Sequence, residues 1–330
     1  MPKIYYDQDA DLAALKGKTV TVVGYGNQGR SQALNLRDSG VKVVVGNTKD
    51  RAWDQAKEDG FDTYRVDEAA SMADVIALLV PDEIAPQVYQ QSVVPHLKEG
   101  TVLDFASGYN VTYGFLEFPE SVDVIMVAPR MIGRAVRELF VQGSGGPSLV
   151  AVHQDSSGKA WDVALAFAKG IGSTRVGALA SSFDEETRCD LFGEQLSGGL
   201  LYMIRTAYEI MIANGVSEEA AILELVASGE REETVRAMTE MGLFQQLVLH
   251  SRTSQYGQQT RGRRMVTERT RQVMEEIMEE IMTGAFAKEW TLEQQAGMPL
   301  FKGLWKLNLA HPFTTAEKHV RETLAPKQRK

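Results

Sequence analysis

Two carboxylates lie four residues apart in the run Asp190-Leu-Phe-Gly-Glu194, at the start of a long helical pattern. Residues four apart lie on one face of a helix, so Asp190 and Glu194 are expected to point the same way. Two anions so placed repel each other unless a cation lies between them, and oxygen ligands suit Mg²⁺ or Mn²⁺. A solvated acidic helix face is the ordinary alternative, but apolar Leu191 and Phe192 argue against open solvent here. The pair therefore predicts a magnesium site.

A glycine-rich turn follows an apolar run and leads into a second helical pattern. In a strand–turn–helix context, its glycine spacing is typical of a dinucleotide site. Gly24 allows a tight turn, Gly26 lets a pyrophosphate approach the backbone, and Gly29 permits close packing of helix on strand. The free N–H groups at the helix N-terminus then bind the phosphates. The predicted dinucleotide-binding residues of this turn are Gly24, Tyr25, Gly26, Asn27, Gln28 and Gly29.

The choice between NADH and NADPH is expected to depend on the segment that ends the second predicted strand. An acidic residue there would bind the ribose diol of NADH, whereas this chain has Asn47. Thr48, Lys49 and Arg51 can all bind a 2′-phosphate. NADPH is therefore the predicted cofactor. NADH is the lesser alternative, because Asp50 is an acidic residue in this segment.

The two halves of the chain have different patterns. In the first half, short β-branched runs alternate with helical segments, which is typical of a parallel, doubly wound α/β sheet. The predicted strands are Thr19–Val23, Val41–Val45, Val75–Val80, Thr101–Phe105, Val124–Val127 and Leu149–Val152. In the second half, no proline occurs from Ser148 to Met298, and helical spacing is seen over Leu200–Ala213, Glu218–Ala227, Glu232–Met241 and Glu268–Ile281. We expect a Rossmann-type domain over residues 1–181 and an all-α domain over residues 182–330.

Composition excludes several classes of protein. The net charge of −9 argues against general nucleic-acid binding, since phosphates would be repelled. The basic run from Arg261 to Arg264 is interpreted as a surface or subunit-contact patch. The single cysteine, Cys189, excludes an internal disulfide and is expected to be a buried packing residue in a reducing cytosol. No apolar run is long enough to span a bilayer, and no signal pattern opens the chain. We expect a soluble, cytoplasmic protein.

Six runs of residues carry a family resemblance. They are Val22–Gly29, Leu34–Gly40, Leu79–Glu83, Asp123–Pro129, Asp190–Gln195 and Phe286–Trp290. With them, the chain resembles a ketol-acid reductoisomerase (acetohydroxy-acid isomeroreductase) of the short bacterial and archaeal type over nearly its whole length. The resemblance implies NADPH, two Mg²⁺ ions and a knotted helical domain. It also implies an alkyl shift in an acetohydroxy acid followed by reduction of the resulting 2-keto acid, in a homodimer or higher homo-oligomer.

The resemblance also implies roles for individual residues. Asp190 and Glu194 are metal ligands by this comparison, and Ser251 contacts the substrate carboxylate. The further cofactor-lining positions that it implies are Asp82, Glu83, Ile84, Ala85 and Gly133. Two of these residues have ordinary alternatives, because Asp82 after a proline could cap a helix and Ser251 could cap a turn.

Two substitutions relative to the family pattern fall at the expected active centre. Ser107 stands where the family has histidine, and serine does not titrate near neutral pH. Arg130 stands where the family has lysine, so the charge is kept but the proton donor is poor. Met131 and Ile132 then add apolar bulk. The predicted catalytic residues are Asp190, Glu194, Ser107 and Arg130.

A third departure concerns a second acid pair, which the family carries on a later helix. One alignment places it at Glu224 and Ser228, and a count without a gap places it at Val226 and Glu230. Either way, one carboxylate is missing. Glu224 and Glu230, six residues apart, would lie on different faces of one regular helix. One metal ion is expected, and whether Glu224 or Glu230 is a ligand, and whether a second ion binds, stays open.

Three functional interpretations follow. The leading one is an NADPH- and Mg²⁺-dependent oxidoreductase that acts on acetohydroxy acids or reduces a related 2-keto or imino acid. A second is a specialised-metabolism reductase without isomerase activity, whose larger substrate contacts Met131 and Ile132. A third is a non-catalytic nucleotide-binding homologue, against which the retained Asp190, Glu194 and Ser251 argue.

Overall fold

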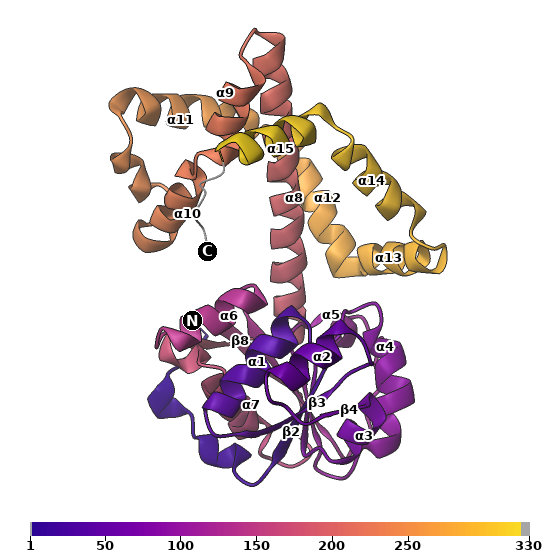
Figure 1. The fold of residues 1–330 in the computed structure, drawn as a ribbon. Helices are drawn as coiled ribbons and strands as arrows, with labels where there is room; N and C mark the ends of the chain where they lie inside the picture. The colour runs from indigo at the N-terminus through magenta and orange to yellow at the C-terminus, as the bar shows by residue number, and fades with distance from the viewer. Residues whose placement is uncertain (1, 325–330) are drawn as a thin grey trace. The chain divides into compact units, whose positions relative to one another are not determined.

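The computed structural model describes residues 2–324, which divide into two compact units (Figure 1). Within the described residues, the first unit ends at Asp190 and the second begins at Leu191. The division falls inside α8 (Phe183–Ala213), a helix of 31 residues whose first two turns belong to the first unit. The domain limits expected from the sequence stay a prediction.

The first unit is built on one sheet with the strand order β1-β9-β8-β7-β6-β5-β2-β3-β4. All six predicted strands are present, as β2 (Thr19–Val23), β3 (Lys42–Gly46), β5 (Val75–Leu78), β6 (Val102–Phe105), β7 (Asp123–Pro129) and β8 (Ser148–Gln154). Three short strands were not predicted, namely β1 (Ile4–Tyr5), β4 (Thr63–Tyr64) and β9 (Ala178–Ala180). Every residue of β2 is buried, as expected of a central strand covered on both faces.

The sheet is mixed rather than wholly parallel, which corrects the sequence prediction. Strand β8 runs antiparallel to β7, with Pro129 opposite Ser148. The connection between them therefore leaves and returns at the same edge of the sheet and does not cross it. Strand β1 also pairs antiparallel with β9, and the other neighbouring strands are parallel. The carboxyl ends of β2, β5, β6 and β7 consequently meet along one edge.

Helices cover both faces of this sheet, so the predicted Rossmann-type, doubly wound architecture is confirmed (Figure 1). They are α1 (Asn27–Asp38), α2 (Arg51–Glu58), α3 (Val66–Ser71), α4 (Ala85–Val88), α5 (Tyr109–Thr112), α6 (Gly133–Val141) and α7 (Ala160–Gly170). One buried cluster contains Val22, Ile125 and Phe167, and the other contains Ile76 and Met126. Alternate residues of the strands thus point to opposite faces of the sheet and pack in two separate hydrophobic cores.

The second unit is helical, as predicted. After α8 it contains α9 (Glu218–Ile222), α10 (Glu230–Met241), α11 (Arg252–Met265), α12 (Glu268–Thr283), α13 (Ala285–Gln295), α14 (Pro299–Leu309) and α15 (Pro312–Leu324). Its buried hydrophobic cluster is small and contains Tyr208, Ala221, Ile222, Leu225, Ala316 and Val320. In Figure 1, α10 and α11 extend on one side of α8 and α12 to α14 on the other. The knot that the resemblance implies stays a prediction.

The predicted helix Glu218–Ala227 is present, but its second half is not regular α-helix, which changes one expectation. It begins as α9 and continues as a π-helical turn over Leu223–Ala227. Gly229 then adopts a left-handed conformation, with φ of 84°, and Glu230 opens α10. Glu224 and Glu230 therefore do not share one regular helix, so the argument from helical faces does not apply to them. Among residues 2–324, no helix is both long and apolar enough to cross a membrane.

Candidate active site

The glycine-rich turn joins β2 to α1 with the geometry that its glycines predict. Gly24 has a φ of 95°, in the left-handed region. A Cβ on Gly29 would lie 1.9 Å from the carbonyl oxygen of Gly24, so the helix packs directly on the turn. Apart from the neighbouring residues Tyr25 and Asn27, no atom of residues 2–324 lies within 4 Å of the place where a Cβ on Gly26 would sit. The N-terminus of α1 is thus exposed at Gly26 and Asn27, where a phosphate can approach its N–H groups.

Two predicted cofactor residues use their side chains to shape this turn. The Tyr25 ring is buried against Phe61, and its hydroxyl donates to Asp59 Oδ2 at 2.9 Å. Burial and the neighbouring Asp59 raise the pKa of Tyr25. Asn47 Oδ1 accepts the backbone N–H of Tyr25 at 3.0 Å, which ties the end of β3 to the turn. Both side chains therefore support the loop rather than present themselves to a ligand.

The residues after β3 form a cap on α2. Asp50 Oδ1 accepts the N–H groups of Ala52 and Trp53, at 2.8 and 3.2 Å. Its other oxygen accepts from the Thr48 hydroxyl at 2.9 Å. These hydrogen bonds hold the pKa of Asp50 below its usual value, although burial opposes them. Lys49 and Arg51 on either side are exposed, and Lys49 Nζ lies 5.8 Å from the Trp53 ring.

The loop after β5 contains the next predicted cofactor residues. Asp82 is not the cap of α4, because the N-cap is Ile84 and uses no side chain. Instead, Asp82 Oδ1 accepts from Asn110 Nδ2 at 3.1 Å. Glu83 and Ile84 are exposed, whereas Ala85, the first residue of α4, is buried. The helix-cap alternative for Asp82 is therefore wrong, and its carboxylate connects the loops after β5 and β6.

Arg130 is the centre of a charged cluster at the carboxyl end of β7. Its Nη1 lies 3.1 Å from Glu186 Oε1, and its Nη2 lies 2.9 Å from Asp190 Oδ1. Glu186 and Asp190 are one turn apart on α8, so they point to the same side of the helix. The Arg130 side chain is 31% exposed and the Glu186 side chain 0%. The positive charge of one partly exposed arginine thus lies next to two carboxylates, one of which is buried.

Glu186 was not among the residues predicted from the sequence. Its Oε2 accepts the backbone N–H of Gly108 at 2.6 Å, which ties α8 to the loop after β6. Burial raises the pKa of Glu186 to about 7, although the Gly108 N–H and the Arg130 charge oppose that shift. The signal was present in the sequence, since Glu186, Asp190 and Glu194 are spaced four residues apart.

Ser107 lies beside this cluster, in the loop after β6. Its Oγ accepts the backbone N–H of Tyr109 at 3.3 Å. A Cβ on the next residue, Gly108, would lie 2.4 Å from the carbonyl oxygen of Phe183. The loop therefore packs tightly against the first turn of α8. Ser107 is half-buried, and through Gly108 it is connected to the carboxylate that also contacts Arg130.

The predicted metal ligands, Asp190 and Glu194, both lie on α8. The Asp190 side chain is 33% exposed, and its Oδ1 forms an ion pair with Arg130. Glu194, four residues later, is exposed. Within residues 2–324, no three acidic, histidine or cysteine side chains gather into a metal-binding group. Mg²⁺ is commonly bound through one or two carboxylates, with water and substrate as its other ligands. Two carboxylates are a ligand set of the kind that one Mg²⁺ ion takes, so Asp190 and Glu194 stay the predicted ligands of one ion.

Cys189 is exposed, so the prediction that it is a buried packing residue is wrong. The physical reason is its place on α8. Glu186 and Asp190 occupy the side of the helix that faces Arg130. Cys189 precedes Asp190 by one residue and is therefore rotated by about 100° from it. Its side chain falls outside the packed side of the helix.

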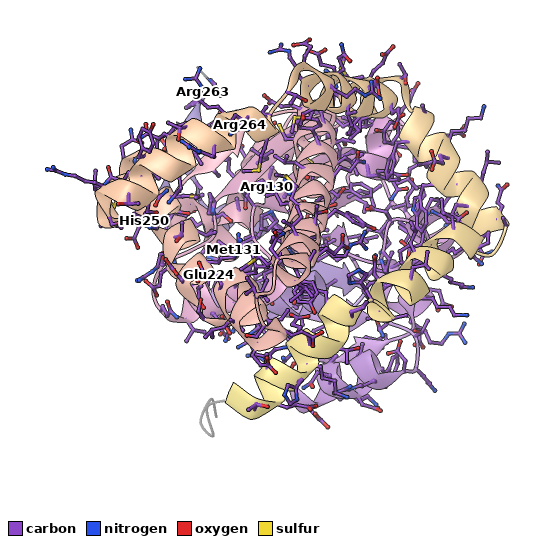
Figure 2. All side chains as sticks on the ribbon, turned by 90° about the horizontal axis from the view of Figure 1, so that it is seen from above. Arg130, Met131, Glu224, His250, Arg263 and Arg264 are labelled. Atoms are coloured by element: carbon purple, nitrogen blue, oxygen red, sulfur yellow. The ribbon has the colours of Figure 1, made fainter. Side chains whose placement is uncertain are left out.

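The remaining predicted residues lie in the second unit. Glu224 is exposed on the π-helical turn, and Glu230 is exposed at the start of α10. Ser251 is the N-cap of α11, and its Oγ accepts the N–H of Ser254 at 3.2 Å, so its ordinary alternative as a cap is realised. Figure 2 shows His250 just before this helix, and Arg263 and Arg264 at its other end.

Comparison with known proteins identifies the family. The description "Acetohydroxy acid isomeroreductase, NADPH-binding domain" matches residues 14–177, and "Ketol-acid reductoisomerase, C-terminal domain" matches residues 183–325. The chain is 45% identical to the "Ketol-acid reductoisomerase (NADP(+))" of Pyrobaculum neutrophilum, over 98% of this chain and 99% of that protein. It is 44% identical to the protein of the same name from Pyrobaculum islandicum, over 99% of each chain.

A solved structure gives the same answer. The NADH-preferring ketol-acid reductoisomerase from an uncultured archean superposes with a TM-score of 0.94 at 37% identity. The match covers 98% of this chain and 100% of the other. The resemblance seen in the sequence motifs is confirmed, and so is the assignment as an oxidoreductase with an NAD(P)H-binding domain. The chain belongs to the ketol-acid reductoisomerase family.

Proposed function

We propose that this protein is an NADPH-dependent reductase of its family that reduces a 2-keto or imino acid and has little of the alkyl-shift activity. The observation that carries the proposal is the contact of Arg130 with both Glu186 and Asp190. An alkyl shift that uses two metal ions needs carboxylates that are free to bind both ions. Here one oxygen of Asp190 already pairs with a fixed organic cation, and the guanidinium cannot deliver a proton near neutral pH.

Magnesium enters the proposal as one ion with Asp190 and Glu194 as ligands. A bound Mg²⁺ would polarise the carbonyl oxygen of the substrate. The chain's own residues supply the rest. Arg130 attracts the anionic substrate and holds it beside Asp190. Ser107 offers a hydroxyl that donates or accepts a hydrogen bond but does not ionise. Ile132, which is 71% exposed, and Met131 beside it present an apolar surface to the substrate side chain.

The dinucleotide is positioned by the glycine-rich turn. The N-terminus of α1, next to Gly26, would hold its pyrophosphate. The carboxyl ends of β2, β6 and β7 lie along the same edge of the sheet, where Ser107 and Arg130 would face the bound nicotinamide. The bound dinucleotide would supply a hydride to the substrate carbonyl carbon, and the carbonyl oxygen would take up a proton from solvent.

NADPH is the proposed form of the cofactor. The Asp50 carboxylate is engaged by four donors, at Asn47, Thr48, Ala52 and Trp53, so it is poorly placed to bind a ribose diol. Lys49 and Arg51 are exposed next to it and can bind a 2′-phosphate. The cofactor preference varies within the family, since the Pyrobaculum relatives are named for NADP(+) and the archean structure for NADH.

We also propose that the working form is a homodimer or a higher homo-oligomer. The second unit leaves large apolar side chains exposed, including Phe244 at 71%, Leu307 at 69% and Trp305 at 55%. Two methionines of this unit, Met265 and Met282, are also exposed, each at 58%. A second copy of the chain would cover these surfaces. The cytoplasmic location expected from the sequence stays a prediction.

The experiment that tests this function is NADPH oxidation by the full-length protein with a 2-keto-3-hydroxy acid and saturating Mg²⁺. We expect turnover that Asp190→Asn lowers by on the order of 10²-fold or more, because the carboxylate contacts both Arg130 and the metal. The matched control is Asp184→Asn, an acid on the same helix that is 60% exposed. Absence of turnover in the wild type, or equal turnover in Asp190→Asn, would contradict the proposal.

A further inference from the structure

Two glutamine side chains join the dinucleotide turn to the segment that carries Arg130. Gln28 lies in the first turn of α1, and its Nε2 donates to the carbonyl oxygen of Met131 at 2.9 Å. Gln32 lies one turn later, and its Nε2 donates to Gln28 Oε1 at 3.2 Å. Gln32 thus orients the amide of Gln28, and Gln28 holds the residue that directly follows Arg130.

The backbones of the two segments also meet. A Cβ on Gly133 would lie 2.2 Å from the carbonyl oxygen of Asn27 and 2.7 Å from the nitrogen of Gln28. The first residue of α6 therefore rests on the first turn of α1. Farther along the same two helices, Arg137 Nη1 donates to Asn35 Oδ1 at 2.9 Å. A displacement at the start of α1 is consequently passed to the start of α6.

Stability alone does not account for the glutamine pair. Gln32 is 0% exposed, and its Oε1 has no hydrogen-bond partner among residues 2–324. A buried amide oxygen without a partner is unfavourable, and an apolar side chain of similar size would avoid that cost. The amide has a use at this position because it fixes which way the Gln28 side chain points.

We propose that Gln28 is a positioning residue that couples binding of the dinucleotide to the placement of Arg130. Phosphates held at the N-terminus of α1 order its first turn. Gln28 then fixes the Met131 carbonyl, and so the backbone from which the Arg130 guanidinium reaches Glu186 and Asp190. The inference rests on the proposed function, in which α1 holds the dinucleotide and Arg130 attracts the anionic substrate. By linkage, the bound dinucleotide and the bound anion raise each other's affinity by the same factor.

Hydrogen exchange of the full-length protein, with and without NADPH, tests the coupling without any turnover. In the wild type, NADPH is expected to slow exchange both in residues 19–30 and in residues 130–136. In Gln28→Leu, the first segment stays protected and the second loses most of its protection. The matched control is Gln154→Leu. Gln154 Nε2 also donates to backbone carbonyls, of Pro119 at 2.8 Å and Val122 at 2.6 Å, but near the other end of β7. Both segments should stay protected in that variant.

Calorimetry with oxalate, a small dianion, measures the same coupling as an affinity. At constant Mg²⁺, NADPH should tighten oxalate binding to the wild type by on the order of tenfold, a typical coupling between two sites. In Gln28→Leu the effect should fall below about twofold on the same scale. Gln32→Leu keeps the buried volume and removes only the orienting donor, so it should lose part of the coupling. It also serves as the second variant if Gln28→Leu does not fold.

The outcomes separate the inference from the function on which it rests. The positioning role would be overturned if Gln28→Leu kept the coupling and the protection of residues 130–136 that the wild type shows. If Gln28→Leu does not fold, the same result in Gln32→Leu would overturn it. A wild type that binds NADPH but shows no protection in residues 130–136 would also overturn it, while leaving the proposed function standing. A wild type that binds neither NADPH nor NADH would contradict the proposed function itself, and the coupling with it.

Discussion

Arg130 Nη2 lies 2.9 Å from Asp190 Oδ1, and the same guanidinium lies 3.1 Å from Glu186 Oε1. The contact with Asp190 is a hydrogen bond, whereas the contact with Glu186 Oε1 is an ion pair without hydrogen-bond geometry. The planar guanidinium, with its several N–H groups, thus contacts two carboxylates one helical turn apart. Glu186 is fully buried and also accepts the Gly108 N–H, which anchors the cluster to the loop that carries Ser107. The acids of α8 are thus part of a charged network within one chain.

Removal of the arginine should destabilise the first unit. Arg130→Ala leaves Glu186 buried without its cation, which is the expensive way to break an ion pair. Because the Arg130 side chain is 31% exposed, we expect a loss of about 1–3 kcal/mol in the free energy of unfolding. Urea unfolding followed by circular dichroism measures it. The control is Arg134→Ala, whose i,i+4 pair with Glu138 is largely exposed and should contribute less than about 0.5 kcal/mol. Equal losses in the two variants would show that the cluster has no special role.

Cofactor preference should depend on the residues that flank Asp50. Lys49→Ala with Arg51→Ala should weaken NADPH binding by about 10- to 100-fold, because up to two charge-assisted contacts to the 2′-phosphate are lost. NADH has no such phosphate, so its affinity should change by less than about threefold. Fluorescence titration with each dinucleotide gives both values. Lys57→Ala is the control, since Lys57 also lies over the Trp53 ring, 5.3 Å from its centroid. An equal loss for the two cofactors would refute the assignment.

Asp104 should make stability depend on pH. Its side chain is fully buried on β6, and burial raises its pKa well above the usual value of 3.8, against weaker lowering by the Val127 and Phe105 N–H groups. Between pH 3.8 and the folded-state pKa, the folded chain holds a proton on Asp104 that the unfolded chain has released. The free energy of unfolding therefore falls as pH rises from about 3.8 toward the folded-state pKa. Asp104→Asn cannot titrate. Its stability relative to the wild type should therefore increase between pH 5 and pH 9 in urea unfolding. A difference that is constant with pH would mean that Asp104 keeps an ordinary pKa.

The oligomeric state can be measured directly. Light scattering at micromolar concentration should give a mass of at least about twice the 36.4 kDa of one chain. The physical reason is the exposed apolar surface of the second unit, around residues such as Phe244 and Trp305. A monomer that is fully active at that concentration would contradict the proposal.

The parts of the fold that the sequence predicts well are those with local signals. The run 19–23 is apolar and β-branched, and Gly24 and Gly29 are required by the tight turn and close packing that follow it. The antiparallel direction of β8 was missed, because it depends on how the connection after β7 returns to the sheet. The helix end at Ala227 agrees with the prediction, but the π-helical turn over Leu223–Ala227 was missed, since it keeps nearly the same apolar spacing as an α-helix.

The sequence predicted several residues of the candidate site but not the contacts between them. Arg130 and Asp190 were both named from the sequence, yet they are 60 residues apart, and no local pattern predicts their ion pair. Glu186 could have been found from its spacing with Asp190 and Glu194. The exposure of Cys189 depends on which side of α8 faces the sheet, and that orientation is set by the packing of Gly108 against Phe183.

The most direct test of the account compares two substrates of one enzyme. The rate of NADPH oxidation is measured at saturating Mg²⁺ with acetolactate, which must rearrange first, and with a pre-formed 2-keto-3-hydroxy acid, which needs only reduction. The alkyl shift requires a stabilised alkoxide and a proton relay, and each lost contribution typically costs on the order of 10²-fold. With Ser107 and Arg130 in place, the pre-formed keto acid should turn over faster by at least that factor. Equal rates with the two substrates would contradict the account and would make this protein an ordinary reductoisomerase.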